Sequence, residues 1–204
     1  MKKIAIIGSG VTGVTTAYQL FKKGYNLTVF EKERYPGMDT SFANGGQLSA
    51  SNAEVWTSKK TVLQGLSWIL KKDAPLLLNP TPSIQKLGWI IEFLSNIPNH
   101  KKNTVATAQM AIKSRKVLNR IIDEEDLKID LEKKGILHLS NSKESFQHGL
   151  KINNWLNEAG LERYPLSLKE IKKIEPNINL KNIYGGFFTK SDMTGDIHLF
   201  TKQL

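Results

Sequence analysis

Three glycines near the N-terminus have the spacing of a phosphate-binding turn, G-x-G-x-x-G. In that pattern the first glycine permits a tight turn, the second lets backbone amides approach a pyrophosphate, and the third lets a helix pack closely on a strand. The helix that follows supplies unpaired N–H groups and a partial positive charge. We therefore expect a dinucleotide to bind here. The motif consists of Gly8, Ser9, Gly10, Val11, Thr12 and Gly13.

An acidic residue follows at the distance expected of a ribose-binding carboxylate. Glu31 comes eighteen positions after Gly13 and ends a short apolar run, residues 27–30. A carboxylate there accepts hydrogen bonds from both ribose hydroxyls of an adenosine and repels a 2′-phosphate, which disfavours NADP. We count the neighbouring Lys32 as a further cofactor-binding candidate.

The elements around the motif have the order strand, helix, strand. Residues 4–7 form an apolar run of the kind found in buried parallel strands. Val14, Ala17, Tyr18 and Phe21 repeat at helical spacing, and Gly24 then ends the helix. Residues 27–30 form the second strand, so about thirty residues make one βαβ unit.

The segment after Glu31 is a second candidate for ligand contacts. Residues 31–53 are rich in Gly, Ser, Thr and Asn and are predicted to be a loop. Paired glycines allow backbone to lie against a flat ring or a phosphate, while hydroxyl and amide groups bond its polar edge. An ordinary turn would explain the composition equally well. The candidates are Thr40, Ser41, Asn44, Gly45, Gly46, Gln47 and Leu48.

The remaining chain alternates helices and strands with turn signals between them. Ser83 is a plausible helix N-cap, and Asp192 and Asp196 are interpreted as a turn residue and an N-cap. We expect helices over 59–72, 83–96, 104–126, 143–159, 167–174 and 198–204, and strands over 136–139 and 184–189.

Composition narrows the classes of partner. The chain has 204 residues, a net charge of +10 and no cysteine, which excludes disulfides and thiolate metal sites. Its lysines are scattered and form no basic tract, so no nucleic-acid partner and no metal are predicted. The N-terminal apolar run is broken at Gly8, so neither a signal peptide nor a membrane span is expected, and we predict a cytoplasmic location.

The motifs together resemble a known family. The glycine motif, Glu31 and the pattern S-x-A-N-G-G-Q at residues 41–47 are similar to the D-amino-acid-oxidase-like flavoproteins. Within that family the chain resembles the bacterial D-amino acid dehydrogenase small subunits, through residues 68–69, 74–76, 194–196 and 199–201. The resemblance spans nearly the whole chain.

The resemblance implies FAD as the cofactor and an α/β fold. The expected architecture is a Rossmann-like FAD-binding βαβ domain with inserted helices, plus part of an α+β substrate domain. We expect the FAD domain with its helical insertion at 1–127, the partial substrate domain at 128–195, and the start of a helix returning to the FAD domain at 196–204. The family gives FAD-contacting roles to Gly8, Gly10, Gly13, Glu31, Ser41, Gly45, Gly46 and Gln47.

The implied reaction is the oxidative deamination of a D-amino acid to a 2-oxo acid and ammonia, with a membrane quinone among the candidate electron acceptors. Two alternatives stay open. One is a glycine- or sarcosine-type amine oxidase of the same family. The other is a non-catalytic FAD-binding fragment, because the family's chains continue well past residue 204 and we expect this one to be truncated.

No catalytic residue is assigned. A substrate carboxylate calls for an arginine, whose planar fork matches it. The four arginines are each interpreted as solvated surface charges: Arg34, Arg115, Arg120 and Arg163.

A basic segment raises the question of a membrane surface. Residues 59–102 contain seven lysines against Asp73 and Glu92, a net charge of +5, together with Trp68 and Trp89. Basic amphipathic helices with tryptophan lie on anionic membranes. Helices that pack on their own domain would show the same pattern, and the sequence leaves both interpretations open.

Overall fold

The computed structural model describes residues 3–69 and 81–204 and divides the chain into two compact units. The first unit contains Met1–Ala50, Ile112–His138 and Phe188–Leu204. The second contains Ser51–Ala111 and Leu139–Phe187. Each unit is thus assembled from segments that lie far apart in the sequence.

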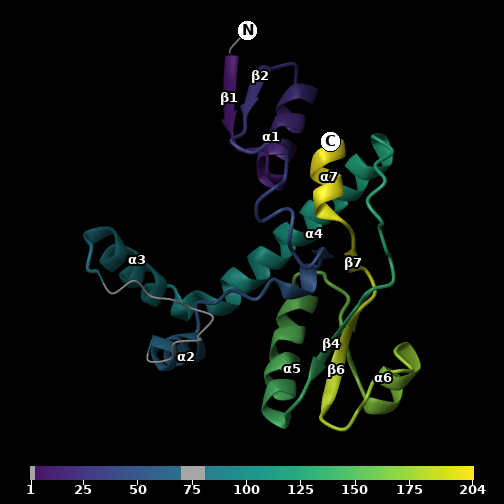
Figure 1. Ribbon diagram of the computed structural model, residues 1–204. Helices are drawn as coiled ribbons and strands as arrows, with labels where there is room; N and C mark the ends of the chain where they lie inside the picture. The colour runs from purple at the N-terminus through teal and green to yellow at the C-terminus, as the bar shows by residue number, and fades with distance from the viewer. Residues whose placement is uncertain (1–2, 70–80) are drawn as a thin grey trace. The chain divides into compact units, whose positions relative to one another are not determined.

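The first unit opens with the predicted βαβ arrangement (Figure 1). Strand β1 (Lys3–Ile7) pairs in parallel with β2 (Asn26–Phe30), and helix α1 (Val11–Lys22) connects them. Gly24, with φ of +80°, follows the helix end in the left-handed conformation that glycine favours. The sequence prediction of this unit is confirmed.

Late segments of the chain complete the first unit. Strand β7 (Met193–Thr194) pairs antiparallel with β3 (Gln47–Leu48), and helix α7 (Ile197–Gln203) follows. The end of helix α4 (His100–Glu124) supplies much of the core. Val11 and Tyr18 of α1 pack against this core, which therefore joins the N-terminal helix to α4 and α7. The buried core residues are Ile121, Ile122, Leu127, Ile129 and Phe200.

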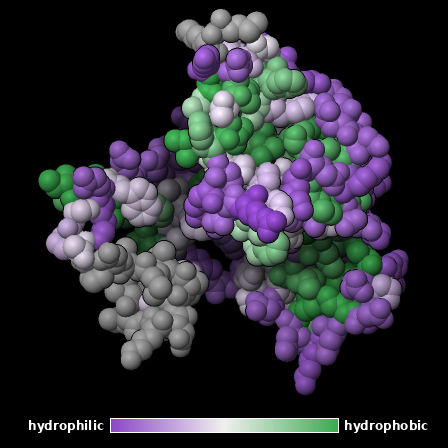
Figure 2. Space-filling model, turned by 45° about the horizontal axis from the view of Figure 1, so that its top comes forward, coloured by the Kyte–Doolittle hydropathy of each residue, from purple (hydrophilic) through white to green (hydrophobic). Residues whose placement is uncertain are grey.

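The βαβ element itself is thinly covered. Ile7 is 91% exposed and Phe30 is 57% exposed, and no residue of β1, α1 or β2 is fully buried. Apolar runs of this kind normally belong to strands with both faces covered. Figure 2 shows hydrophobic side chains reaching the surface among hydrophilic ones.

The second unit contains helices α2 (Lys59–Ile69), α3 (Ile84–Ser95), α5 (Lys143–Glu158) and α6 (Leu168–Ile174), with the short 3₁₀ turn η2 (Ile97–Asn99). The strand β5 (Tyr164–Leu166) belongs to a three-stranded sheet of order β4-β6-β5. The division between the units passes through β4 (Ile136–Ser140), β6 (Gly185–Thr189) and α4.

Close packing of α5 on β6 depends on glycine. A Cβ at Gly149 would lie 2.4 Å from the ring of Phe187, and one at Gly185 would lie 2.7 Å from the ring of Phe146. The two phenylalanine rings stack with centroids 5.1 Å apart. The helix and strand therefore approach each other as closely as their aromatic side chains allow.

Most of the predicted elements are present, with ends that differ by a few residues. Ser83 is confirmed as the N-cap of α3, accepting from the Lys86 amide, and Asp196 caps α7. The loop predicted over residues 31–53 is wrong in part, because it contains β3 and the 3₁₀ turn η1 (Ala50–Asn52). Strands of two or three residues carry little periodicity of their own and form through distant pairing, so β3, β5 and β7 escaped prediction.

Some predictions lie outside the described residues. These are the last residues of the helix expected over 59–72 and the family-like residues 74–76. The charges at Lys71, Lys72 and Asp73 lie there too.

Candidate functional site

The glycine motif forms a tight turn between β1 and α1. Gly8 has φ of +92°, and its amide donates to the Phe30 carbonyl at 2.7 Å. A Cβ at Gly13 would lie 2.0 Å from the Gly8 carbonyl oxygen, a distance no side chain tolerates. The third glycine is therefore required for α1 to begin against the turn.

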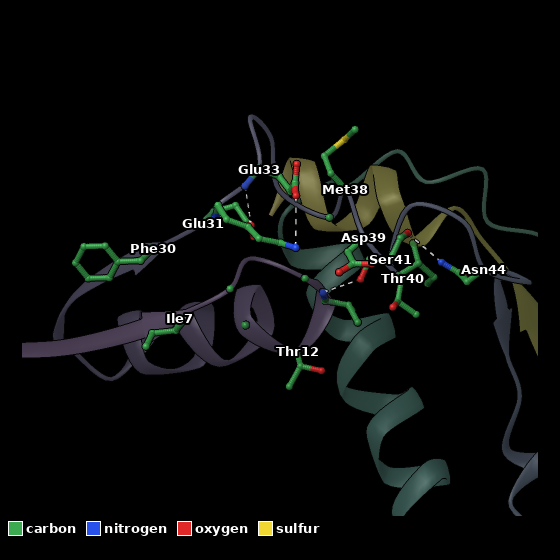
Figure 3. A pocket seen from close by; sticks show the side chains of 17 residues that line it. Ile7, Thr12, Phe30, Glu31, Glu33, Met38, Asp39, Thr40, Ser41 and Asn44 are labelled. Atoms are coloured by element: carbon green, nitrogen blue, oxygen red, sulfur yellow. Dashed lines mark hydrogen bonds and ion pairs between the residues drawn. The ribbon is translucent and has the colours of Figure 1, made fainter. Parts of the chain in front are cut away.

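A cleft of about 710 Å³ opens at this turn (Figure 3). Its walls come from the β1–α1 turn, the end of β2, the segment 37–44 and the first residue of α7. The residues that line it are Ile7, Gly8, Gly10, Val11, Thr12, Gly13, Phe30, Glu31, Lys32, Glu33, Gly37, Met38, Asp39, Thr40, Ser41, Asn44 and Ile197.

Glu31 is fixed at one end of the cleft by four hydrogen bonds. One carboxylate oxygen accepts from the Ser9 amide at 2.7 Å and the Ser9 hydroxyl at 2.6 Å. The other accepts from the amides of Lys32 at 2.7 Å and Glu33 at 3.0 Å. These bonds, that of the Ser9 hydroxyl first, lower the pKa of Glu31 to about 2.

The carboxylate is consequently ionised at neutral pH and accepts hydrogen bonds only. Its four lone-pair positions are all in use, so a ribose hydroxyl would take the place of a present donor. The Ser9 hydroxyl is the donor that side-chain rotation can remove. A 2′-phosphate would meet the full negative charge.

Ser41 lies against the first turn of α1. Its hydroxyl oxygen accepts from the Val11 amide at 3.0 Å, one of the N–H groups that a helix leaves without an internal partner. Asn44 holds the segment in shape, because its side-chain amide donates to the Ser41 carbonyl at 2.9 Å and its side-chain oxygen accepts from the Gly46 amide at 2.7 Å. Hydroxyl and amide groups thus gather where a helix N-terminus favours an anion.

A second cavity, of about 340 Å³, shares Asn44 and Ile197 with the first. Gly46 has φ of +60°, and a Cβ there would lie 2.7 Å from the Gly195 carbonyl oxygen. The Gly195 amide donates to the Gly46 carbonyl at 2.8 Å. The second cavity is lined by Phe42, Asn44, Gly45, Gly46, Asp130, Thr194, Gly195, Asp196 and Ile197.

The structure brings most predicted site residues together. Ten of them line the cleft: Gly8, Gly10, Val11, Thr12, Gly13, Glu31, Lys32, Thr40, Ser41 and Asn44. Gly45 and Gly46 line the second cavity, and Ser9 is buried beneath Glu31. Gln47 and Leu48 form β3 and line neither cavity.

Sequence reasoning missed several lining residues. Glu33 and Asp39 add two carboxylates to Glu31, and Lys32 pairs with Glu33 at 3.6 Å. An anion bound here would therefore depend on N–H and hydroxyl groups more than on cations. Ile197 was also missed, although it follows the family-like residues 194–196 directly.

The segment that lines the cleft is supported by α7. The Gly37 carbonyl lies 3.1 Å from His198 Nδ1, and the His198 ring meets the Phe42 ring edge-on at 4.9 Å. Thr201 lies under Gly37, where a Cβ would approach its side chain to 3.1 Å. A helix at the end of the chain thus shapes a loop near its beginning.

Two of the arginine predictions are wrong. Arg115 has a side chain only 12% exposed and pairs with Asp192, whose side chain is fully buried. Arg163 is also buried and lies over the Phe187 ring at 4.2 Å from its centroid. Distant contacts bury both arginines, and helical or loop position in the sequence gives no sign of that. Arg34 and Arg120 are exposed, as predicted.

A family model described as FAD dependent oxidoreductase matches residues 3–204. The chain belongs to this family of FAD-dependent oxidoreductases. The family resemblance predicted from the sequence is therefore confirmed, whereas the roles of the individual site residues stay predictions.

Among curated relatives, the chain is 52% identical to "D-amino acid dehydrogenase 3" of Mesorhizobium japonicum, over 100% of this chain and 49% of that protein. The chain spans about half the length of the curated relatives it matches.

Solved structures show the same fold at low identity. A glycine oxidase from Geobacillus kaustophilus matches with a TM-score of 0.66 and 17% identity, over 100% of this chain and 43% of that one. An L-α-glycerophosphate oxidase from Mycoplasma pneumoniae, solved with FAD bound, matches with a TM-score of 0.56 and 19% identity, over 99% and 41%.

The described residues contain neither a helix suited to span a membrane nor a cluster suited to hold a metal ion. Within residues 3–69 and 81–204, no helix combines the length and hydropathy needed to cross a bilayer. In the same ranges no group of three or more His, Asp or Glu side chains is arranged to hold a metal ion.

Proposed function

We propose that the chain binds FAD across the two cavities of the first unit and that it forms the cofactor-binding part of a D-amino acid dehydrogenase. The observation that carries the proposal is the pairing of an ionised Glu31 with a helix N-terminus in one cleft. We call the region of Gly8, Gly13 and Glu31 the adenosine end. We call the region of Gly45, Gly46 and Gln47 the flavin end.

The residues present fit FAD. An adenosine ribose would bond the Glu31 carboxylate, and the pyrophosphate would lie at the first turn of α1 near Ser41 and Thr40. The turn has no room for a Cβ at Gly13, so α1 begins directly at the turn, where Val11 lines the cleft. We assign Gln47 and Leu48 to the flavin end because β3 continues directly from Gly46.

The substrate assignment comes from the relative that is 52% identical. The D-amino acid would lose a hydride and a proton, and water would then convert the imino acid to a 2-oxo acid and ammonia. Bound FAD supplies the hydride acceptor and passes the electrons to a further acceptor. The chain's own residues bind and orient the cofactor, and the role of residues 128–195 as part of a substrate domain stays a prediction.

The binding claim is tested by titrating the purified chain with FAD and measuring visible absorbance and flavin fluorescence. We expect saturable binding that Glu31→Gln weakens by about tenfold, the loss of one charged hydrogen-bond partner. Glu124→Gln is the matched control, because it makes the same change at an exposed pair on α4. A folded chain that ignores FAD would overturn the proposal.

The substrate claim is tested by joining the chain to the C-terminal half of the Mesorhizobium relative and measuring dye reduction. We expect D-alanine to support turnover and glycine and sarcosine to do so poorly. Faster turnover of glycine or sarcosine with oxygen consumption would favour an amine oxidase. FAD binding without any turnover would support a non-catalytic role for the chain.

A second proposal concerns the helices α2 and α3, which we propose to lie on an anionic membrane surface. Ile84, Leu87, Ile91 and Leu94 recur at helical spacing along α3, yet their exposed fractions run from 44% to 87%. Such a stripe normally faces a core. Exposed Leu63 and Leu66 on α2, with Lys59 nearby, add apolar area and positive charge.

Sedimentation with vesicles tests the membrane proposal. We expect the chain to pellet with vesicles that contain phosphatidylserine and to remain in solution with phosphatidylcholine alone. Ile84→Ser with Ile91→Ser should abolish pelleting, whereas Ile174→Ser, at an exposed position of α6, should not. Equal pelleting of all three proteins would exclude α3 as the contact.

A further inference from the structure

A buried carboxylate joins three distant segments of the first unit. The Asp192 side chain is fully buried, and one of its oxygens accepts from Arg115 and from the Ala50 amide at 3.0 Å. The other oxygen accepts from the Ser49 hydroxyl at 2.8 Å. Arg115 uses its second terminal nitrogen to donate to the Ser191 hydroxyl at 2.9 Å. The pair thus connects α4, the β6–β7 turn and the segment after β3.

The short ladder beside this pair needs such support. Strands β3 and β7 meet over only two residue pairs, Gln47 with Thr194 and Leu48 with Met193. A ladder of that length is too weak to fix its own register. Because Ser49 and Ala50 follow Leu48 directly, their bonds to Asp192 extend the attachment on the same side.

Both walls of the second cavity adjoin the pair along the chain. Gly45 and Gly46 form one wall and lie a few residues before Ser49. Thr194, Gly195 and Asp196 form the other wall and lie a few residues after Asp192. A displacement of the Asp192 carboxylate would therefore move the two walls relative to each other.

We propose that Arg115 and Asp192 are positioning residues that hold the flavin end of the site in the shape that receives the isoalloxazine ring. A planar guanidinium that bonds a carboxylate and a hydroxyl together fixes direction as well as distance. The bonds of the pair reach Ser49, Ala50 and Ser191, which adjoin the flavin end along the chain. The inference rests on the proposed function, since it needs FAD in the cleft.

Comparison of two ligands separates positioning from simple stability. Under the proposed function FAD would occupy both ends of the site, whereas ADP would occupy the adenosine end alone. We would measure the dissociation constants of both ligands for the wild-type chain, Arg115→Lys and Ser49→Ala. Arg120→Lys is the matched control, because it makes the same exchange on the same helix at an exposed pair.

We expect Arg115→Lys and Ser49→Ala to weaken FAD binding by about ten- to a hundredfold, as a misplaced contact surface does, and to leave ADP binding unchanged. The visible spectrum of bound flavin should lose fine structure in both variants, because the ring is held less rigidly. Arg120→Lys should match the wild-type chain in every measurement.

Two results would overturn the inference, and each differs from a failure of the proposed function. Equal losses of FAD and ADP affinity would make the pair a general stabiliser. Unchanged affinities with an unchanged flavin spectrum would leave the flavin end independent of the pair. A variant that unfolds, as judged by circular dichroism, would be replaced by the milder Ser49→Ala as the deciding case. A wild-type chain that binds ADP but not FAD, or neither ligand, would instead refute the proposed function and the inference with it.

Discussion

The adenosine end and the flavin end of the candidate site are built from contacts of very different range. Glu31 accepts from Ser9, 22 positions away. At the flavin end Ser49 donates to Asp192 across 143 positions, and at the segment between the ends His198 meets Gly37 across 161. The adenosine end forms from residues that are close in the sequence. The flavin end forms only when the C-terminal residues contact the segment after β3.

This difference in contact range indicates which substitutions should disturb each end of the site. Local contacts cost little chain entropy to close, but the βαβ element that makes them contains no fully buried residue. Long-range contacts close a large loop, and a buried core and a buried ion pair offset the entropy cost of that closure here. We therefore expect changes at late residues to affect an early loop, and we order four tests by expected size.

The largest effect should come from Asp192→Ala. Removal of the carboxylate leaves Arg115 mostly buried without its charge partner, which costs about 3–5 kcal/mol of unfolding free energy. Urea denaturation of the FAD-free chain measures it. Glu124→Ala serves as a control, because it removes an exposed partner of Arg120 and should change the free energy of unfolding by less than about 1 kcal/mol. Similar values for the two variants would contradict the long-range account of the flavin end.

A glycine pair tests the adenosine end. Gly13→Ala forces a Cβ to within 2.0 Å of the Gly8 oxygen and should lower the free energy of unfolding by about 1–3 kcal/mol while abolishing FAD binding. Gly10→Ala places its Cβ 3.5 Å from the Ser41 hydroxyl, an ordinary contact, so this variant should fold normally and lose only FAD affinity. Denaturation and FAD titration distinguish them. Equal stability of both variants would refute the tight turn.

Removal of the N-cap of α7 should have a smaller effect on stability and should also weaken FAD binding. Asp196 accepts from the Leu199 amide at 2.9 Å, and Asp196→Ala should cost about 1 kcal/mol of unfolding free energy. It should also weaken FAD binding, since α7 supports the segment near Gly37. Ser142→Ala removes an equivalent cap from α5 in the second unit and should leave FAD affinity unchanged. If the two variants lower FAD affinity alike, α7 has no special part in the site.

The smallest effect concerns the pKa of Glu31. Because its pKa lies at about 2 rather than 4.5, ionised Glu31 stabilises the fold above pH 4.5, and this contribution disappears as the pH falls toward 2. Ser9→Ala removes the strongest cause and should raise the pKa of Glu31 toward 4.5. NMR titration of the side-chain carboxyl carbon measures the shift. An unchanged pKa would show that the backbone amides suffice.

The sequence predicted the adenosine end almost completely. The spacing of Gly8, Gly10 and Gly13 between an apolar run and a helical period determines the turn, and Glu31 follows at the end of the next strand. The glycine motif and the βαβ unit lie in the same thirty residues, so no distant contact is needed to predict them. Helix caps such as Ser83 and Asp196 were predictable for the same reason.

The residues of the flavin end were predicted, but their pairing and their contacts were not. Thr40 to Leu48 could be chosen by residue type. No sequence pattern, however, indicated the register of β3, the partner of Gly46 or the bond between Ser49 and Asp192. Arg115 looked like one more surface charge on a helix. Its burial depends on which segment lies beside α4, and local patterns contain no information about that neighbour.

The sequence alone therefore determined the fold class, the glycine turn, the position of Glu31 and the family. Each of these depends on spacing within a short segment or on motifs matched along the chain. Only the tertiary structure decided how the end of the chain shapes the loop near its start. Ile197 in the cleft, His198 at Gly37 and the Arg115–Asp192 pair all arise from the packing of α4 and α7 in one core. The physical reason is that burial is a property of neighbours in space, and those neighbours lie more than seventy positions apart in the chain.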